Sequence, residues 1–354
     1  MAQNITAQQR AQLFAASTRQ HFQMIGSKEI SGGAQSVEFE VPKARILHNI
    51  KLLVEAEVKV KGSGTVDLPS KVAPYDLFRM ISVNFNNGFK PIQVSGSELA
   101  LDNMLYTEAH MIYASEDGST LCMAPEKFTA SSEGAVNKIK FLIDVPLALN
   151  YRDPTSMVMV QNAETSVVLA LDIGYANAII GNADGFSADF GSVKIQAMAT
   201  TYSIPGDSRC WPDFSVLKIL NSNNFAITQG QNTIKLPTGL IYRKMILRFE
   251  DENGNPMSLE DITSNIELIL NTADTPYSIS PAMLREIDKM QAGIEFPEGC
   301  FYFSWDYQGQ NGYGGARDLM DLERATCFEV RFSSGKSGKL TVIGEKISRL
   351  ISAQ

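Results

Sequence analysis

The sequence predicts an all-β protein built from two tandem copies of one domain, each a Greek-key sandwich or a jelly roll. Three observations support this prediction. An offset of 195 residues (236 minus 41) superimposes the strand that follows Val41-Pro42 on the strand that follows Leu236-Pro237. Short alternating strands fill both halves, and each half has one helix within a long connection. No segment shows the strand–helix alternation that is typical of a parallel α/β sheet.

The repeat extends well beyond the two prolines. The offset aligns similar apolar residues and also one polar pair: Phe39, Val41, Pro42, Ile46, Leu47, His48, Ile50 and Leu52 with Ile234, Leu236, Pro237, Ile241, Tyr242, Arg243, Met245 and Leu247. A chain of 354 residues has room for two domains of ordinary size. We therefore expect an N-terminal arm at 1–28, a first domain at 29–210 and a second domain at 211–354.

The first half opens with a long strand at 46–61, in which apolar residues alternate with polar and charged ones. The same pattern predicts further strands at 81–85, 139–145, 167–173 and 193–197. Ser95 and Glu98 have the spacing of a capping box, so a helix should begin there. Two polar, Gly/Ser-rich stretches, 114–136 and 174–190, lie between these strands and are expected to be loops.

The second half repeats this order. After the long strand that begins near Ile241, strands are expected at 266–270, 301–305, 328–332 and 340–342. Ser280-Pro281 combines a capping serine with a proline at the first helical position, which predicts the start of a helix. Each half thus reads as several strands, one helix and further strands.

The N-terminal arm is expected to be an amphipathic helix. Its apolar stripe consists of residues spaced three or four apart: Ala7, Ala11, Phe14, Thr18, Phe22 and Ile25. Gly26 and Gly32-Gly33 should end this helix and form a hinge. Residues 1–28 hold three basic residues and no acid, so their charge is +3 and the remainder carries −11 (−8 minus +3). Such a helix either packs on its own domain or a neighbouring subunit, or lies on a membrane surface.

Composition limits the function classes. The chain is 44 % hydrophobic and 20 % charged, as in ordinary globular proteins, and its acidic body argues against sequence-specific nucleic-acid binding. No apolar run approaches the roughly 20 residues that span a bilayer, and the first residues lack a secretory signal, so we expect synthesis in the cytoplasm. The four cysteines are widely spaced, which predicts reduced thiols, with neither a disulfide framework nor a zinc site.

No motif predicts a catalytic, cofactor or metal site. His48 lies on the apolar face of its strand, where a core histidine is expected. Gly335-Lys336-Ser337 resembles the end of a phosphate-binding loop, but Val330 occupies the position of the required earlier glycine, so a hairpin is expected. The aromatic run at 301–313 could stack on sugars. Its alternation from Phe301 to Tyr307 favours a strand that faces the core.

Two tandem β-domains, an amphipathic arm and the lack of a catalytic motif together resemble one family. The chain resembles the double jelly-roll major capsid proteins of tailless icosahedral viruses with an internal membrane. Its opening, MAQNITAQQRAQLFAASTRQHFQMIG, is most similar to the tectivirus major capsid proteins of phages that infect Gram-positive bacteria. The resemblance covers essentially the whole chain and implies two eight-stranded jelly rolls. The family is defined by architecture more than by residue motifs, so no residue role carries over by position.

The resemblance also implies a function. The protein would be a structural component of the virion and no enzyme, and it would need no cofactor. Its homotrimers would form pseudo-hexagonal tiles, with neighbouring trimers, vertex or penton proteins, minor capsid proteins and the viral internal membrane as partners. As a hypothesis, the residues of the arm that contact this membrane are Arg10, Phe14, Arg19, Phe22 and Ile25.

Two alternatives remain open from the sequence. The first is a glycan-acting hydrolase or amidase on the same fold, whose activity one carboxylate substitution would abolish. The second is a carbohydrate-binding viral spike or adhesin that uses the 301–313 aromatics, and whose glycan binding Trp305→Ala would remove.

Overall fold

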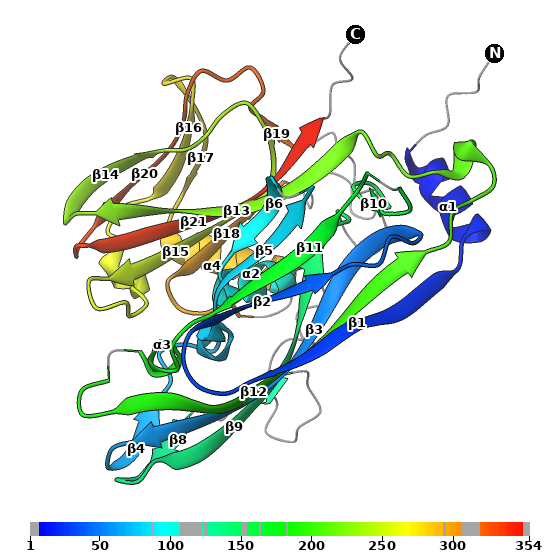
Figure 1. Cartoon of the computed structure of the whole chain (residues 1–354). Coiled ribbons are helices and arrows are strands. Elements are labelled where there is room, and N and C mark those ends of the chain that lie inside the picture. The colour runs from blue at the N-terminus through cyan, green and yellow to red at the C-terminus, as the bar shows by residue number, and fades with distance from the viewer. Residues whose placement is uncertain are drawn as a thin grey trace.

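The computed structural model contains two β-domains that lie side by side (Figure 1). It describes residues 7–349, apart from 87, 107–121, 124–126, 150–153, 163, 182, 293–294 and 306–318.

The first domain is a jelly roll of eight main strands. These strands are β1 (Gln20–Ile30), β2 (Gln35–Glu40), β3 (Ile46–Lys61), β5 (Phe78–Phe85), β6 (Phe89–Val94), β9 (Ala135–Pro146), β11 (Val167–Ile173) and β12 (Ser187–Tyr202). One sheet has the antiparallel order β1-β12-β3-β9, and the other has the antiparallel order β2-β11-β5-β6. The first strand therefore pairs with the last and the second with the seventh, as in a jelly roll.

The second domain repeats this topology strand for strand. Its strands are β13 (Val216–Ile227), β14 (Gly230–Lys235), β15 (Ile241–Asp251), β16 (Ile266–Leu270), β17 (Asp274–Ile279), β18 (Cys300–Ser304), β20 (Phe328–Ser334) and β21 (Gly338–Arg349). The two orders are β13-β21-β15-β18 and β14-β20-β16-β17. The starts of β2 and β14, and those of β3 and β15, differ by the predicted 195 residues (230 minus 35, and 241 minus 46). The internal repeat is confirmed.

A helix lies between the fifth and sixth main strands of each roll: α2 (Gly96–Tyr106) in the first and α4 (Pro281–Ala292) in the second. The capping box of α2 is present, because the Ser95 N–H donates to Glu98 Oε2 (2.7 Å) and the Glu98 N–H donates to Ser95 Oγ (3.3 Å). At α4 the Met283 N–H donates to Ser280 Oγ (3.3 Å). Both predicted helix starts are confirmed.

Smaller elements complete the chain. They are α1 (Ala7–Ser17), α3 (Asn177–Ile180), β4 (Gly64–Asp67), β7 (Cys122–Met123), β8 (Lys127–Ala130), β10 (Val158–Met159), β19 (Met320–Asp321) and the 3-10 helices η1 (Ala73–Leu77), η3 (Ser208–Cys210) and η4 (Leu259–Asp261). The two stretches expected as loops therefore contain regular structure. The first holds β7, β8 and the start of β9, and the second holds the buried Ile179 and Ile180 of α3. Residues 114–121 and 124–126 of the first stretch lie outside the described chain.

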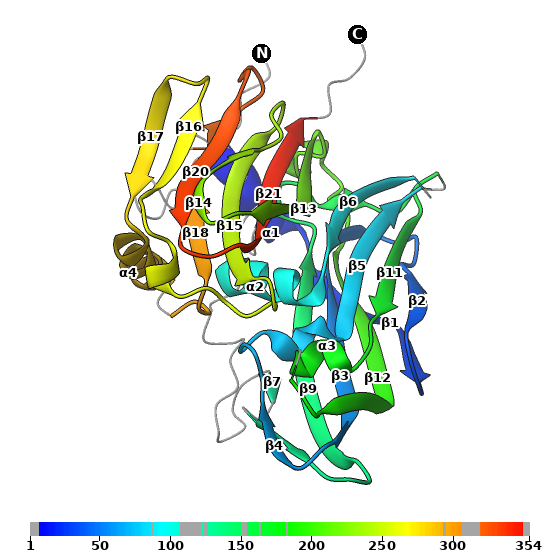
Figure 2. The same ribbon diagram turned by 90° about the vertical axis from the view of Figure 1, so that its left-hand side faces the viewer.

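One sheet passes from the first roll into the second. β6 and β13 pair in parallel, at Ile92 with Leu220 and Gln93 with Asn221, which makes a continuous sheet in the order β2-β11-β5-β6-β13-β21-β15-β18. The core of the first roll also continues into the second, because it includes Leu220, Ile246 and Ile343. Figure 2 shows α2 between the two rolls and α4 on the outer side of the second roll. The rolls thus share both a sheet and part of a core.

The N-terminal segment corrects the prediction of one long helix. α1 ends at Ser17, and β1 pairs with β12 along its length. The expected boundary at residue 28 falls inside β1, so this strand belongs to the first roll. Gly26 lies at a register irregularity within β1 and is not a hinge. Backbone pairing with the open edge of β12 outweighs the helical spacing of Phe14, Thr18 and Phe22, because it satisfies a whole row of amide groups.

Candidate functional site

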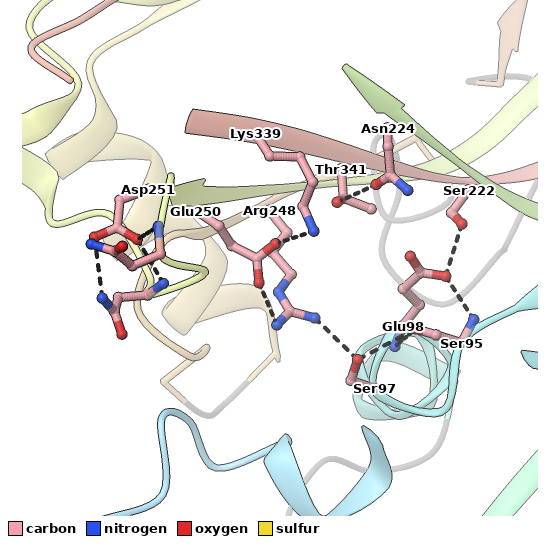
Figure 3. Close-up of polar contacts among 12 residues, drawn as sticks. Ser95, Ser97, Glu98, Ser222, Asn224, Arg248, Glu250, Asp251, Lys339 and Thr341 are labelled. Atoms are coloured by element: carbon pink, nitrogen blue, oxygen red, sulfur yellow. Dashed lines mark hydrogen bonds and ion pairs between the residues drawn. The ribbon is translucent and has the colours of Figure 1, made fainter. Parts of the chain in front are cut away.

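The junction between the rolls holds a connected set of polar contacts. α2 lies on the outer face of the sheet formed by β13, β21 and β15 (Figure 3). Ser222 Oγ donates to Glu98 Oε2 (2.8 Å), and Arg248 Nη1 donates to Ser97 Oγ (3.0 Å). Arg248 also pairs with Glu250 (2.7 Å). Hydrogen bonds from two strands of the second roll therefore fix the helix of the first.

The polar layer continues across the sheet. Lys339 pairs with Glu250 (2.7 Å), and Thr341 Oγ1 donates to Asn224 Oδ1 (2.6 Å). On the side of the first roll, burial raises the pKa of Asp76 to about 6, although Arg248 opposes this rise. Because most of these groups have directional partners, the layer specifies how the rolls are oriented, as well as holding them together.

A cluster of buried charges lies in the same junction. Glu345 pairs with Lys218 (Oε2–Nζ 2.9 Å) and with Arg243 (Oε1–Nη1 2.6 Å), and all three side chains are almost completely buried. Burial alone would raise the pKa of Glu345, but Arg243, Lys218 and Lys244 lower it to about 2. Arg243 also donates to the carbonyl oxygen of Leu149 in the first roll (2.6 Å). The carboxylate is therefore ionised at neutral pH and links the strands of the second roll to the first.

Asp102 brings a second carboxyl group from α2 to this cluster. It is buried, and burial raises its pKa, whereas the nearby cation of Lys218 opposes the rise. The predicted core histidine His48 is buried beside Tyr202, with ring centroids 5.8 Å apart, so that prediction is confirmed. Its repeat partner Arg243 is buried in the charge cluster instead. The same position thus serves the core in one roll and the junction in the other.

The first two residues of the proposed membrane contact lie on α1, where Phe14 faces the protein and the Arg10 side chain stays partly exposed. Phe14 of α1 is only 3 % exposed and packs against Tyr202, with ring centroids 5.4 Å apart. Arg10 lies 3.9 Å from Asp213, in the connection between the rolls. The helix α1 therefore packs on the first roll and on this connection, which is one of the placements that the sequence left open.

The remaining three residues of that set lie on or beside β1. Arg19 is exposed between α1 and β1, Phe22 is 62 % exposed on the outer face of β1, and Ile25 packs against the core of the first roll. The structure therefore does not bring the five residues onto one surface. The strand period of β1 turns Phe22 and Ile25 to opposite faces.

Two further sequence predictions concern the second roll. Phe301, Phe303 and Trp305 are buried, as predicted for a strand that faces the core; Tyr307 and Tyr313 lie outside the described residues. Gly335-Lys336-Ser337 forms the connection between β20 and β21, and Lys336 pairs there with Asp261 (2.9 Å). The stretch joins two strands, as expected, but the predicted hairpin is wrong: β20 pairs with β14 and β16, whereas β21 pairs with β13 and β15 in the other sheet.

Three of the cysteines, Cys210, Cys300 and Cys327, are free. Within the described ranges, no three histidine, cysteine or carboxylate side chains gather in a way that could hold a metal ion. None of the described helices is long and apolar enough to cross a membrane.

Comparison with known proteins gives matches in structure only. No protein-family model and no curated protein matches the sequence. Among solved structures, a chain from Sulfolobus Turreted Icosahedral Virus matches with a TM-score of 0.68 and 12 % identity, over 94 % of this chain and 91 % of that chain. The major capsid protein of bacteriophage PM2 gives 0.56 and 10 %, over 94 % and 98 %. The Faustovirus major capsid protein gives 0.58 and 8 %, over 95 % and 91 %.

These likenesses cover nearly the full length of each pair of chains, so they include both rolls and the way the rolls are joined. The chain has the double jelly-roll fold found in viral major capsid proteins. The predicted fold class is thereby confirmed, apart from the long helical arm.

Proposed function

We propose that this chain is a major capsid protein whose homotrimers are pseudo-hexagonal tiles of an icosahedral shell. One observation carries the proposal: the two rolls have the same strand order and lie side by side in one chain. Three such chains around a threefold axis would offer six similar sides to their neighbours. The matched proteins named as major capsid proteins support it, because they align over nearly the whole of this chain.

The proposal gives the protein a structural and not a catalytic role in the virion. Its partners are then further copies of itself, together with vertex and minor capsid proteins. Trp305, on which the carbohydrate-binding alternative depended, is 1 % exposed and cannot stack on a sugar without local unfolding. No feature of the described residues favours the hydrolase alternative over the capsid role.

We also propose that the shell encloses a membrane and that the protein belongs to the tectivirus lineage. The support is the opening of the chain at residues 1–26 and its basic character. Because Phe14 and Ile25 are turned into the protein, the contact with anionic headgroups would fall to Arg10 and Arg19.

This contact can be tested on assembled shells. The double variant Arg10→Gln/Arg19→Gln should reduce their co-flotation with anionic vesicles, because each basic residue near such a surface contributes about 1 kcal/mol. Lys90→Gln, which removes an exposed cation from another part of the first roll, is the matched control and should float like the wild type. Unchanged flotation of the double variant would rule out this contact while leaving the capsid role intact.

Electron microscopy of the purified protein tests the capsid role itself. Averaged particles should show threefold symmetry with six density lobes, one for each roll. Particles with only two lobes at every concentration would contradict the proposal.

A further inference from the structure

Among the described residues, two surfaces lack the partners that their equivalents in the internal repeat have. In the chain, α2 of the first roll covers the outer face of the β13-β21-β15 sheet of the second roll. The equivalent outer face of the β1-β12-β3 sheet keeps exposed apolar residues, and so does α4, the equivalent of α2. The contact between α2 and the β13-β21-β15 sheet can therefore serve as a template for a contact between α4 and the β1-β12-β3 sheet.

The strand pairing fixes which residues are equivalent on the two sheets. In the second roll, Ser222, Ile343 and Ile246 form one row across β13, β21 and β15. In the first roll, the corresponding row across β1, β12 and β3 is Met24, Met198 and Lys51, and 51 plus 195 gives 246. The next row contains Leu220 and Lys244 in the second roll, and Phe22 and Asn49 in the first. Lys244 and Asn49 are again 195 residues apart, so Leu220 and Phe22 are equivalent.

Exposure differs sharply between these equivalent positions. Leu220 and Ile343 are buried against the first roll, and Ser222 bonds to Glu98. On the first roll, Phe22 is 62 % exposed and Met24 is 55 % exposed. An apolar face of this kind on an otherwise charged surface marks an interaction site.

The two helices are equivalent in how they are attached. Their capping serines, Ser95 and Ser280, are 185 residues apart. At the same offset, Asn103 Oδ1 accepts the N–H of Asp144 (2.8 Å), and Asp288 Oδ2 accepts the N–H of Tyr302 (2.9 Å).

These two hydrogen bonds hold N–H groups at equivalent positions of the two rolls. Asp144 is paired with Lys51, and Tyr302 is paired with Ile246, so the two N–H groups belong to the equivalent rows described above. α4 is therefore anchored to its roll as α2 is anchored to its own, and it presents the equivalent face.

The offset of 185 also shows what that face carries. Glu98 of α2, which contacts the second roll, corresponds to Met283 of α4, and the buried Asp102 corresponds to Ile287. Met283 is 59 % exposed and Met290, one turn further along from Ile287, is 77 % exposed. Residues at this spacing lie on one side of a helix. The exposed face of α4 is thus apolar where the covered face of α2 is polar.

The changes on the helix and on the sheet match each other. Inside the chain, Glu98 meets Ser222 through a hydrogen bond. At the equivalent uncovered positions, both residues are replaced by methionine: Met283 on the helix and Met24 on the sheet. A polar pair in the chain thus corresponds to an apolar pair between two free surfaces of the same chain. Methionine side chains adapt well to such contacts.

We propose that α4 of one copy docks on the outer face of the β1-β12-β3 sheet of a second copy, with Met283 against Met24 and Phe22. This inference rests on the proposed capsid role and deepens it by naming the surface between subunits. The contact between two chains would then have the same arrangement as the contact between the two rolls within one chain. A repeated head-to-tail step closes into a ring when its rotation permits, and six rolls in the ring require three chains.

Cross-linking tests the contact directly. The double variant Met24→Cys/Met283→Cys, oxidised in dilute solution, should give covalent dimers and trimers on a non-reducing gel. The wild type and each single variant are the controls, because they contain the native cysteines but not the proposed pair. Absence of covalent trimer from a protein that is trimeric by native mass would overturn the proposed contact.

A series of substitutions tests the contact by introducing the residues of the Glu98–Ser222 pair at the equivalent positions 283 and 24. Met283→Glu should raise the concentration at which the trimer dissociates by at least about tenfold, because it places a charge against an apolar face. Adding Met24→Ser should restore much of the loss, since the double variant recreates the pair made by Glu98 and Ser222. Met283 is largely exposed in the single chain, so the melting temperature of dissociated protein should not change.

The outcomes separate this inference from the proposed function. A wild-type trimer that Met283→Glu leaves unchanged refutes the docking of α4 but not the capsid role. A wild type that is monomeric at all concentrations refutes the capsid role, and with it the docking. If Phe22→Ser leaves the trimer intact but abolishes binding to anionic vesicles, the face contacts lipid and the proposed docking is wrong.

Discussion

Replacing Glu345 by glutamine should destabilise the whole protein and not only the second roll. Its carboxylate holds Lys218 and Arg243 within 2.9 Å, and Arg243 in turn bonds to Leu149 of the first roll. Glutamine keeps the size of the side chain but removes the charge. The two cations would then remain buried without the carboxylate that pairs with both of them, in a junction where the rolls share one sheet and part of a core.

The expected loss follows from how deeply the three groups are buried. Their side chains are 0–6 % exposed, and breaking a buried ion pair by removing one partner costs about 3–5 kcal/mol. Glu55→Gln is the matched control, because the pair of Glu55 and Lys140 is as short (2.7 Å) but 41 % and 49 % exposed. An exposed pair contributes about 0–1 kcal/mol. The loss in the free energy of unfolding should therefore be at least about threefold larger for Glu345→Gln than for Glu55→Gln.

Urea unfolding as a function of pH measures both the loss and its origin. The pKa of Glu345 in the folded protein is lowered to about 2 from an ordinary value of 4.5. Its contribution is thus fully present above pH 4.5 and disappears as the pH falls toward 2. The stability difference between wild type and Glu345→Gln should narrow over this range. Equal losses for Glu345→Gln and Glu55→Gln at pH 7, or a difference that stays constant into acid, would refute this reasoning.

Two further predictions concern the helices. Burial raises the pKa of Asp288 to about 8, so the folded protein loses stability as the pH rises from about 4 to 8. The variant Asp288→Asn places at this position the residue that α2 has at the equivalent position, Asn103. Measured by urea unfolding, it should stabilise the protein by about 1–3 kcal/mol at pH 9 and little at pH 4. Gly96→Ala should cost about 1–3 kcal/mol, because its methyl group would collide with the carbonyl oxygen of Tyr75, whereas Gly206→Ala, in open space, should be neutral in the same thermal melts.

Local patterns in the sequence were sufficient for most of the fold. The alternation at 46–61 predicted the bounds of β3, and the capping pattern at Ser95 and Ser280 predicted both helix starts. The duplication was visible because equivalent strands in the two rolls need the same apolar residues toward the core. These signals depend on neighbours within a few positions, which is why a single sequence reveals them.

The N-terminal segment shows where local reasoning fails. The residues from Phe14 to Ile25 fit a helical stripe, yet those from Gln20 onward form a strand whose partner, β12, is more than 160 positions away (187 minus 20). The packing of Phe14 against Tyr202 likewise depends on the tertiary structure. No window of the sequence contains both partners, so helical and strand patterns could not be separated there.

The junction was missed for a related reason. On β21, Lys339 and Thr341 alternate with Leu340 and Val342, a pattern that normally indicates a solvent-facing side. In the structure this side is covered by α2 of the other roll, which no periodicity predicts. The available signal was Arg243 at the repeat position of His48, which placed a charged residue where the first half has a buried one.

The central claim is that this chain acts as a trimeric capsid tile, and its native mass tests that claim most directly. Light scattering coupled to size-exclusion chromatography should give about 116 kDa, three times 38.8 kDa, unchanged over a wide dilution series. A mass of 38.8 kDa at every concentration would contradict the claim, because a chain that never associates cannot form six-sided tiles.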